Sequence, residues 1–115
     1  MVKQGFLIWL DFDPQLGHEQ KGRRPALVVS NETFSNFSKM AIVCPITNTD
    51  KDYPFHVKLD GRTKTTGVIL SDQVKTVDIG ARNFEFIERA PDDILLEVID
   101  IINGFIELEN REPYT

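Results

Sequence analysis

The densest group of polar side chains lies in the segment GHEQKGRRP, residues 17–25. Within nine residues it holds an imidazole, a carboxylate, an amide and three cations: His18, Glu19, Gln20, Lys21, Arg23 and Arg24. RNA transesterification needs a base for the ribose 2′-hydroxyl, an acid for the departing 5′-oxygen and cations for the charge on phosphorus. The segment could supply all of these. For His18 or Glu19 taken singly, a solvated charged loop is the alternative.

Arg24 is the strongest single candidate in this segment. It precedes Pro25 at the entrance of an apolar run, and proline stiffens the backbone there. A guanidinium on a stiff backbone suits bidentate binding of a phosphate. As an alternative, Arg24 could pair with Asp11 or Asp13.

Two further polar pairs stand at the ends of apolar runs: Thr47 with Asn48, and Asp72 with Gln73. The hydroxyl of Thr47 could donate to a phosphate, or it could simply turn the chain. The carboxylate of Asp72 could act as a base or could cap backbone amides. Taken alone, each pair favours the structural interpretation.

Phe55 stands close to Tyr53 and Lys51. Aromatic faces beside a cation are typical of sites for single-stranded nucleic acid, whereas aromatic side chains in strands usually belong to the core. We expect Phe55 to serve partly in each role.

No metal or cofactor site is expected. Cys44 is the only cysteine and lies within an apolar run, so it is expected to be an inert core residue rather than a nucleophile. The two histidines, His18 and His56, lack the spacing of metal ligands.

Short, β-branched and aromatic runs with turn residues between them predict a mainly β protein of the α+β type. Residues 13–24 are expected to form a long loop, and Ser30 to cap one helical turn. Pro91 and the two aspartates after it predict the start of a helix. The expected strands are 5–12, 26–29, 41–46, a hairpin of 55–59 with 68–70, and 84–87, and the expected helix is 91–108. We therefore predict a small, strongly curved barrel with a C-terminal helix.

The chain of 115 residues, 41% of them hydrophobic, is expected to form a single domain over residues 1–115. The single cysteine and the absence of a leader-like N-terminal segment predict a cytoplasmic protein, and no apolar run is long enough to cross a membrane. The net charge is −5, but residues 1–83 carry 11 basic and 9 acidic side chains, against 2 and 9 in residues 84–115. A locally basic groove for RNA is therefore compatible with the composition. The wide apolar stripe of the predicted helix favours a dimer.

The motifs DFDP, GHEQ-x-G-x-RPA, CPIT, YPF and GV-x-L-x-DQVK occur here in order over about residues 3–107. In this combination the chain closely resembles the MazF/PemK family of toxin endoribonucleases. The resemblance implies an SH3-like barrel of the CcdB/PemK fold and a two-fold homodimer. It also implies metal-independent cleavage of single-stranded RNA to a 2′,3′-cyclic phosphate and a 5′-hydroxyl. The implied partner is a MazE-like antitoxin whose acidic, extended segment covers the RNA groove.

The resemblance also implies roles for individual residues. Arg24 matches the arginine of the RPA motif and Thr47 the threonine of the PIT motif, and these two are expected to carry catalysis. Glu19 and His18 match the loop residues of GHEQ and are candidates for the base, as is Asp72, which matches the aspartate of the DQ motif. The PemK branch has a catalytic arginine two residues before that aspartate, where this chain has Leu70.

The cation for the transition state is therefore expected from Arg24, assisted by Arg23 or Lys21. Gln20, Asn48, Phe55 and Gln73 are expected to contact RNA. The alternative from another class is a non-catalytic CcdB-like toxin that binds DNA gyrase, because the same barrel serves both functions.

Overall fold

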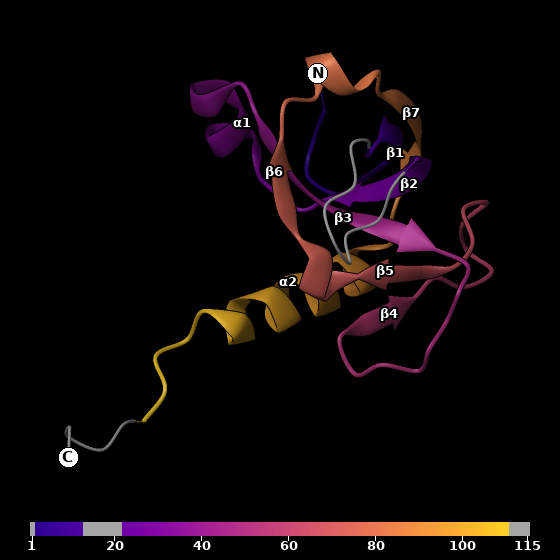
Figure 1. Ribbon diagram of the computed structural model, residues 1–115, viewed down its shortest axis with the longest axis vertical. Coiled ribbons are helices and arrows are strands. Elements are labelled where there is room, and N and C mark those ends of the chain that lie inside the picture. Colours follow the sequence, from indigo (N-terminus) through magenta and orange to yellow (C-terminus); the bar gives the residue numbers. More distant parts are fainter. Residues whose placement is uncertain (1, 13–21, 111–115) are drawn as a thin grey trace.

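A computed structural model of the protein describes residues 2–12 and 22–110. Seven strands and two α-helices, with two short 3-10 turns (η1 and η2), follow one another along the chain (Figure 1). In order they are β1 (Phe6–Asp11), β2 (Arg23–Val28), α1 (Glu32–Ser38), β3 (Ala41–Thr47), β4 (His56–Lys58), β5 (Val68–Leu70), η1 (Ser71–Gln73), β6 (Lys75–Val77), η2 (Gly80–Arg82), β7 (Glu85–Arg89) and α2 (Asp92–Phe105).

The strands form one antiparallel sheet in the order β4-β5-β3-β2-β1-β7, and β6 also pairs with β3. The sheet is strongly curved in the upper part of Figure 1. Among the described residues its two end strands, β4 and β7, do not pair with each other, so the sheet is not closed into a barrel. The predicted mainly β architecture with a C-terminal helix is confirmed.

Strand pairing along one edge of β3 is interrupted in the middle of that strand. β5 pairs with the end of β3 and β6 pairs with its start, and η1 lies between them. Cys44 and Pro45 of β3 therefore have no strand partner on this edge, and Pro45 has no N–H to offer. The interruption places η1, which carries Asp72 and Gln73, beside the middle of β3 and next to the pair that β5 makes with the end of β3.

Alternation along the strands separates two groups of buried side chains. One face of the sheet buries a core that includes Leu10, Ala26 and Val43. The other face packs against α2, where Ile94 and Val98 are buried together with the side chains of Leu7, Leu27, Cys44, Ile46, Val57 and Ile69. Because α2 covers only this second face, the first face remains available to form a site where its strands end.

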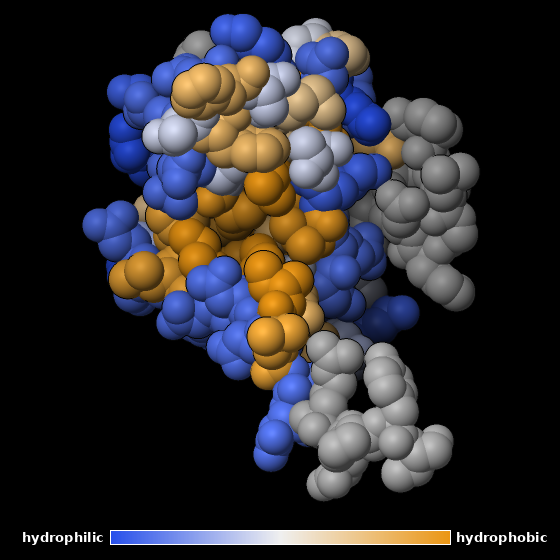
Figure 2. Space-filling model, turned by 90° about the vertical axis from the view of Figure 1, so that its left-hand side faces the viewer, coloured by the Kyte–Doolittle hydropathy of each residue, from blue (hydrophilic) through white to orange (hydrophobic). Residues whose placement is uncertain are grey.

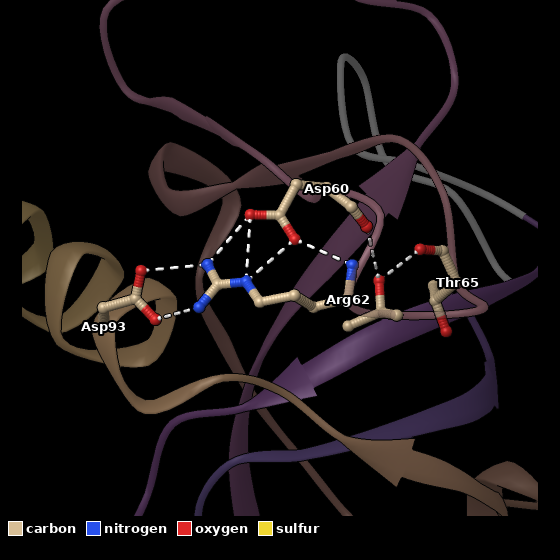
Figure 3. Close-up of polar contacts among 5 residues, drawn as sticks. Asp60, Arg62, Thr65 and Asp93 are labelled. Carbon is tan, nitrogen blue, oxygen red and sulfur yellow. Dashed lines mark hydrogen bonds and ion pairs between the residues drawn. The ribbon is translucent and has the colours of Figure 1, made fainter.

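A polar cluster ties the loop between β4 and β5 to α2. The guanidinium of Arg62 donates to both carboxylate oxygens of Asp60 and to both of Asp93, with the shortest contact to each at 2.8 Å (Figure 3). We call Asp60, Arg62 and Asp93 the Arg62 clasp. The same loop is held from β7 by Glu88, which accepts hydrogen bonds from the backbone N–H groups of residues 64 and 65. The β4–β5 hairpin is thus anchored at its loop to both α2 and β7.

Most of the predicted elements are confirmed, including the 55–59 and 68–70 hairpin, whose strands pair as β4 and β5. The predicted cap at Ser30 was wrong by one residue: Asn31 caps α1 by accepting from the N–H of Phe34, and Ser30 accepts from the N–H of Ile42 instead. α1 also has 7 residues rather than one turn. The predicted helix was three residues too long at its end, because α2 stops at Phe105, directly after Gly104.

Candidate active site

A pocket of about 440 Å³ lies where β2 begins and β3 ends. Its wall combines cations, hydroxyls, an imidazole and a carboxylate, and it also includes one aliphatic side chain. The lining residues are Arg24, Thr47, Thr49, Lys51, Tyr53, His56, Leu70, Asp72 and Gln73. Four of them, Arg24, Thr47, Asp72 and Gln73, were predicted as site residues from three separate sequence segments, and the fold brings all four together.

Strand register places Arg24 and Thr47 on the same face of the sheet. β2 and β3 pair with Ala26 opposite Pro45, and continuing this register by two residues sets Arg24 opposite Thr47. Side chains directly opposite each other in an antiparallel pair project to the same side. Both side chains line the pocket, so they can contact one shared phosphate.

The hydroxyl of Thr47 is held in place by a local turn. The side chain is almost buried, and its Oγ1 accepts from the backbone N–H of Thr49 at 3.2 Å. A hydroxyl accepts through a lone pair, so this bond leaves its proton able to donate. An oriented donor of this kind suits a phosphate oxygen.

His56 of β4 faces Asp72 of η1 across the pocket wall. Its Nε2 lies 3.4 Å from Oδ1 of Asp72, and the imidazole and the ring of Tyr53 meet edge to face with 5.2 Å between centroids. The sequence drew attention to His56 only as a poor metal ligand. Its pairing opposite Leu70, two residues before Asp72, was the signal that could have placed it at the site.

Arg23 lies next to Arg24 but projects away from the pocket. Its guanidinium donates to Asp11 at 3.1 Å, to Glu85 at 3.2 Å and to the carbonyl oxygen of Asn83 at 2.8 Å. The ion pair with Asp11 that was considered for Arg24 is therefore made by Arg23. This arrangement ties β2 to the strands β1 and β7.

Asn48 and Phe55 also lie outside the pocket lining. Oδ1 of Asn48 accepts from the hydroxyl of Thr66 at 2.9 Å. Phe55 is half-buried, and its ring meets those of Tyr53 and Phe105 edge to face, with centroids 5.3 and 4.9 Å apart. The aromatic side chain that lines the pocket is thus Tyr53, two positions earlier in the chain.

The predicted site residues His18, Glu19, Gln20 and Lys21 lie outside the described residues. Cys44 is fully buried, and burial, followed by the nearby negative charge of Asp72, raises the pKa of its thiol to about 12. A thiol with such a pKa is a poor nucleophile, and the prediction of an inert core cysteine is confirmed. In the described part of the chain, no three His, Cys, Asp or Glu side chains are grouped so as to hold a metal ion.

Comparison with known proteins finds a family that spans nearly the whole chain. The family described as PemK-like, MazF-like toxin of type II toxin-antitoxin system matches residues 3–106. The chain belongs to this family. Endoribonuclease PemK of Escherichia coli is 41% identical over 97 residues, which are 80% of this chain and 73% of that protein. Endoribonuclease toxin MazF of E. coli K12 is 47% identical over 78 residues, 68% of this chain and 69% of that protein.

Solved structures of MazF proteins share the fold. The crystal structure of MazF from Deinococcus radiodurans superposes with a TM-score of 0.86 at 39% identity and covers 91% of this chain and 96% of that one. A MazE–MazF structure from the same organism has a TM-score of 0.80 at 39% identity, with 91% and 95% covered. The predicted membership of the MazF/PemK family is therefore confirmed. None of the helices described for this MazF/PemK protein has both the length and the apolar character of a membrane span.

Proposed function

We propose that this protein is the toxin of a toxin–antitoxin pair and a metal-independent endoribonuclease for single-stranded RNA. The observation that carries the proposal is the convergence of Arg24 and Thr47 on one polar pocket. Relatives named PemK and MazF are endoribonucleases by name. A gyrase poison would not need a pocket of this chemistry, and the CcdB-like alternative is not favoured.

In the proposed reaction, the ribose 2′-oxygen attacks phosphorus and the bond from phosphorus to the 5′-oxygen breaks. The products are a 2′,3′-cyclic phosphate and a 5′-hydroxyl. Arg24 stabilises the charge on the pentacoordinate phosphate, and Thr47 orients the phosphate. The 2′-hydroxyl proton passes to a base and the departing 5′-oxygen takes up a proton. Asp72 is a carboxylate in the pocket wall that can accept the first proton, and Glu19 and His18 remain candidates beyond the described residues.

RNA contacts are proposed for further residues around the pocket. Gln73, which lines the pocket beside Asp72, would bind the RNA strand directly. Arg23, Asn48 and Phe55 would act from outside the lining, on nucleotides that extend past it. Gln20 and Lys21, which precede β2 in the sequence and lie outside the described residues, complete the proposed set.

The proposed partners are a second copy of the chain and a protein antitoxin. The side of the molecule on which α1 and α2 project carries a broad apolar area (Figure 2). On α2, Phe105 is 40% exposed and Ile106, directly after it, is 78% exposed. Such an area suits a homodimer of single-domain subunits.

The second proposed partner is the antitoxin. The cations that line the pocket would attract an acidic, extended antitoxin segment of the MazE type. The reaction would take place in the cytoplasm.

The test is cleavage of a long single-stranded RNA by the purified protein in the presence of EDTA. Arg24→Ala should lower the rate roughly 10²- to 10³-fold, the scale of losing one donor to the transition state. Arg89→Ala removes an arginine side chain of β7 that does not line the pocket, and it is the matched control. A folded Arg24→Ala protein with the activity of the control would contradict the assigned role.

A second substrate separates the proposed chemistry from attack by water. RNA with deoxyribose at the nucleotide 5′ to the cut should bind but resist cleavage, because the attacking oxygen is missing. Continued cleavage at that bond would mean that water is the nucleophile.

A further inference from the structure

The imidazole of His56 is built into the wall of the pocket. Its side chain is only 10% exposed. β4 and β5 pair with His56 directly opposite Leu70, and the chain turns from Leu70 into η1, which carries Asp72. The backbone pairing therefore sets the distance between the histidine and the aspartate. The Arg62 clasp holds the loop of this hairpin against α2.

The two ring nitrogens of His56 have different surroundings. Nε2 faces Oδ1 of Asp72 at 3.4 Å, whereas Nδ1 is buried and has no hydrogen-bond partner among the described residues. A proton on Nδ1 would bury an unpaired N–H, whereas a proton on Nε2 leaves only a lone pair buried at Nδ1. The arrangement therefore favours a proton on Nε2, directed at the carboxylate.

Asp72 is the more accessible member of this pair. Its side chain is 32% exposed, and both side chains line the same pocket as Arg24 and Thr47. An incoming ribose can thus reach the carboxylate more easily than the imidazole behind it. A contact of 3.4 Å is long for a hydrogen bond, and catalytic contacts of this kind commonly shorten when the substrate binds.

We infer that His56 is a positioning residue for RNA cleavage. Through its Nε2–H it holds the ionised carboxylate of Asp72 toward the ribose, so that Asp72 can accept the 2′-hydroxyl proton. His56 itself forms no bond to substrate and takes no proton. The inference rests on the proposed endoribonuclease function and adds to it the group that orients its base.

The experiment measures kcat and KM on a short RNA for wild type, Asp72→Asn, His56→Gln, His56→Asn and the double variant His56→Asn/Asp72→Asn. The amide nitrogen of glutamine reaches about as far as Nε2, whereas that of asparagine reaches only about as far as Nδ1. Gln and Asn are therefore a matched pair that differ in where they present a donor. Thermal melting of each variant checks that the fold is retained.

Asp72→Asn should lower kcat roughly 10²-fold or more, the scale of losing a general base. His56→Asn should lower kcat roughly tenfold or more with little change in KM, because it leaves substrate binding intact and loosens the base. His56→Gln should keep most of the activity. The double variant should be no slower than Asp72→Asn alone, because the histidine acts only through the carboxylate.

Three kinetic results would overturn the inference: His56→Asn as active as wild type, losses that multiply in the double variant, or a folded His56→Gln as slow as His56→Asn. Wild-type protein is assayed first, and failure to cleave any RNA would remove the proposed function itself. Nitrogen NMR of the wild-type imidazoles gives a second readout that needs no His56 variant, and the chain has only two histidines to assign. The Nε2–H tautomer of His56 is expected, and an Nδ1–H tautomer would refute the inference.

Discussion

Replacement of Gly67 by alanine should damage both the stability of the protein and its site. Gly67 has a φ of +115°, and a Cβ atom at this position would overlap the carbonyl oxygen of Thr47 and lie 2.9 Å from its carbonyl carbon. Both contacts are with the backbone at the end of β3, which pairs with Val68 of β5. The strands can accept the methyl group only by moving apart where β3 presents Thr47 to the pocket.

The expected loss of stability is the sum of two effects, backbone strain and overpacking. A non-glycine residue in such a backbone conformation costs about 1–3 kcal/mol, and overpacking costs about 1–3 kcal/mol more. Gly67→Ala should therefore lower the free energy of unfolding by about 2–6 kcal/mol, against a total of about 5–15 kcal/mol for a domain. At about 4–8 °C per kcal/mol for a domain of this size, the melting temperature should fall by about 10 °C or more.

Urea denaturation and thermal melting measure the stability, and RNA cleavage at a temperature where the variant is folded measures the site. A displacement of Thr47 by about 1 Å should cost roughly 10²-fold in rate. Alanine variants of two other glycines separate the effect of backbone strain from that of overpacking. Gly22 has a φ of +78°, and no atom of the described residues lies within 4 Å of its added Cβ, so Gly22→Ala tests backbone strain. Gly61, whose added Cβ also meets no described atom, tests neither effect. The reasoning is refuted if Gly67→Ala unfolds at the same urea concentration as Gly61→Ala.

Two other predictions concern groups whose pKa is shifted. Hydrogen bonds from the Arg62 guanidinium, and then from its backbone N–H, lower the pKa of Asp60 from 3.8 to about 2. A carboxyl with a lowered folded-state pKa stabilises the fold above its unfolded pKa, so the free energy of unfolding should fall as the pH drops from about 4 to about 2. Arg62→Met should weaken this dependence in urea titrations, and an unchanged acid limb would show that the Arg62 clasp does not contribute. Cys44, with its pKa raised to about 12 by burial, should react with a thiol reagent at pH 8 only at the rate of unfolding. Rapid labelling of the native protein would contradict the buried position.

Local patterns in the sequence were sufficient to locate most elements of the fold. Alternating side chains around residues 55–59 and 68–70 predicted a hairpin, and β4 and β5 pair there. The proline and aspartates at 91–93 predicted the start of α2. These features depend on neighbours close in the chain, so the sequence contains them directly. The end of α2 and the cap of α1 were misplaced by a few residues, because the differences in free energy between adjacent end points are small.

The composition of the site was only partly accessible from the sequence. The motifs identified Arg24, Thr47, Asp72 and Gln73, and all four line one pocket. They ranked Arg24 above Arg23 but did not show on which side of the sheet each side chain lies. Neighbouring side chains of a strand face opposite sides, and pairing of β2 with β1 and β3 decides which side holds the pocket.

His56 shows most clearly what depends on tertiary structure. Nothing in its immediate neighbours in the chain connects it to Asp72, which lies sixteen positions later. The two side chains meet because β4 pairs with β5 and because the strand pairing along β3 is interrupted at η1. The sequence by itself determined which residue types and strands were present. Only long-range pairing, whose register depends on the whole sheet, decided which of these residues face one another across the pocket.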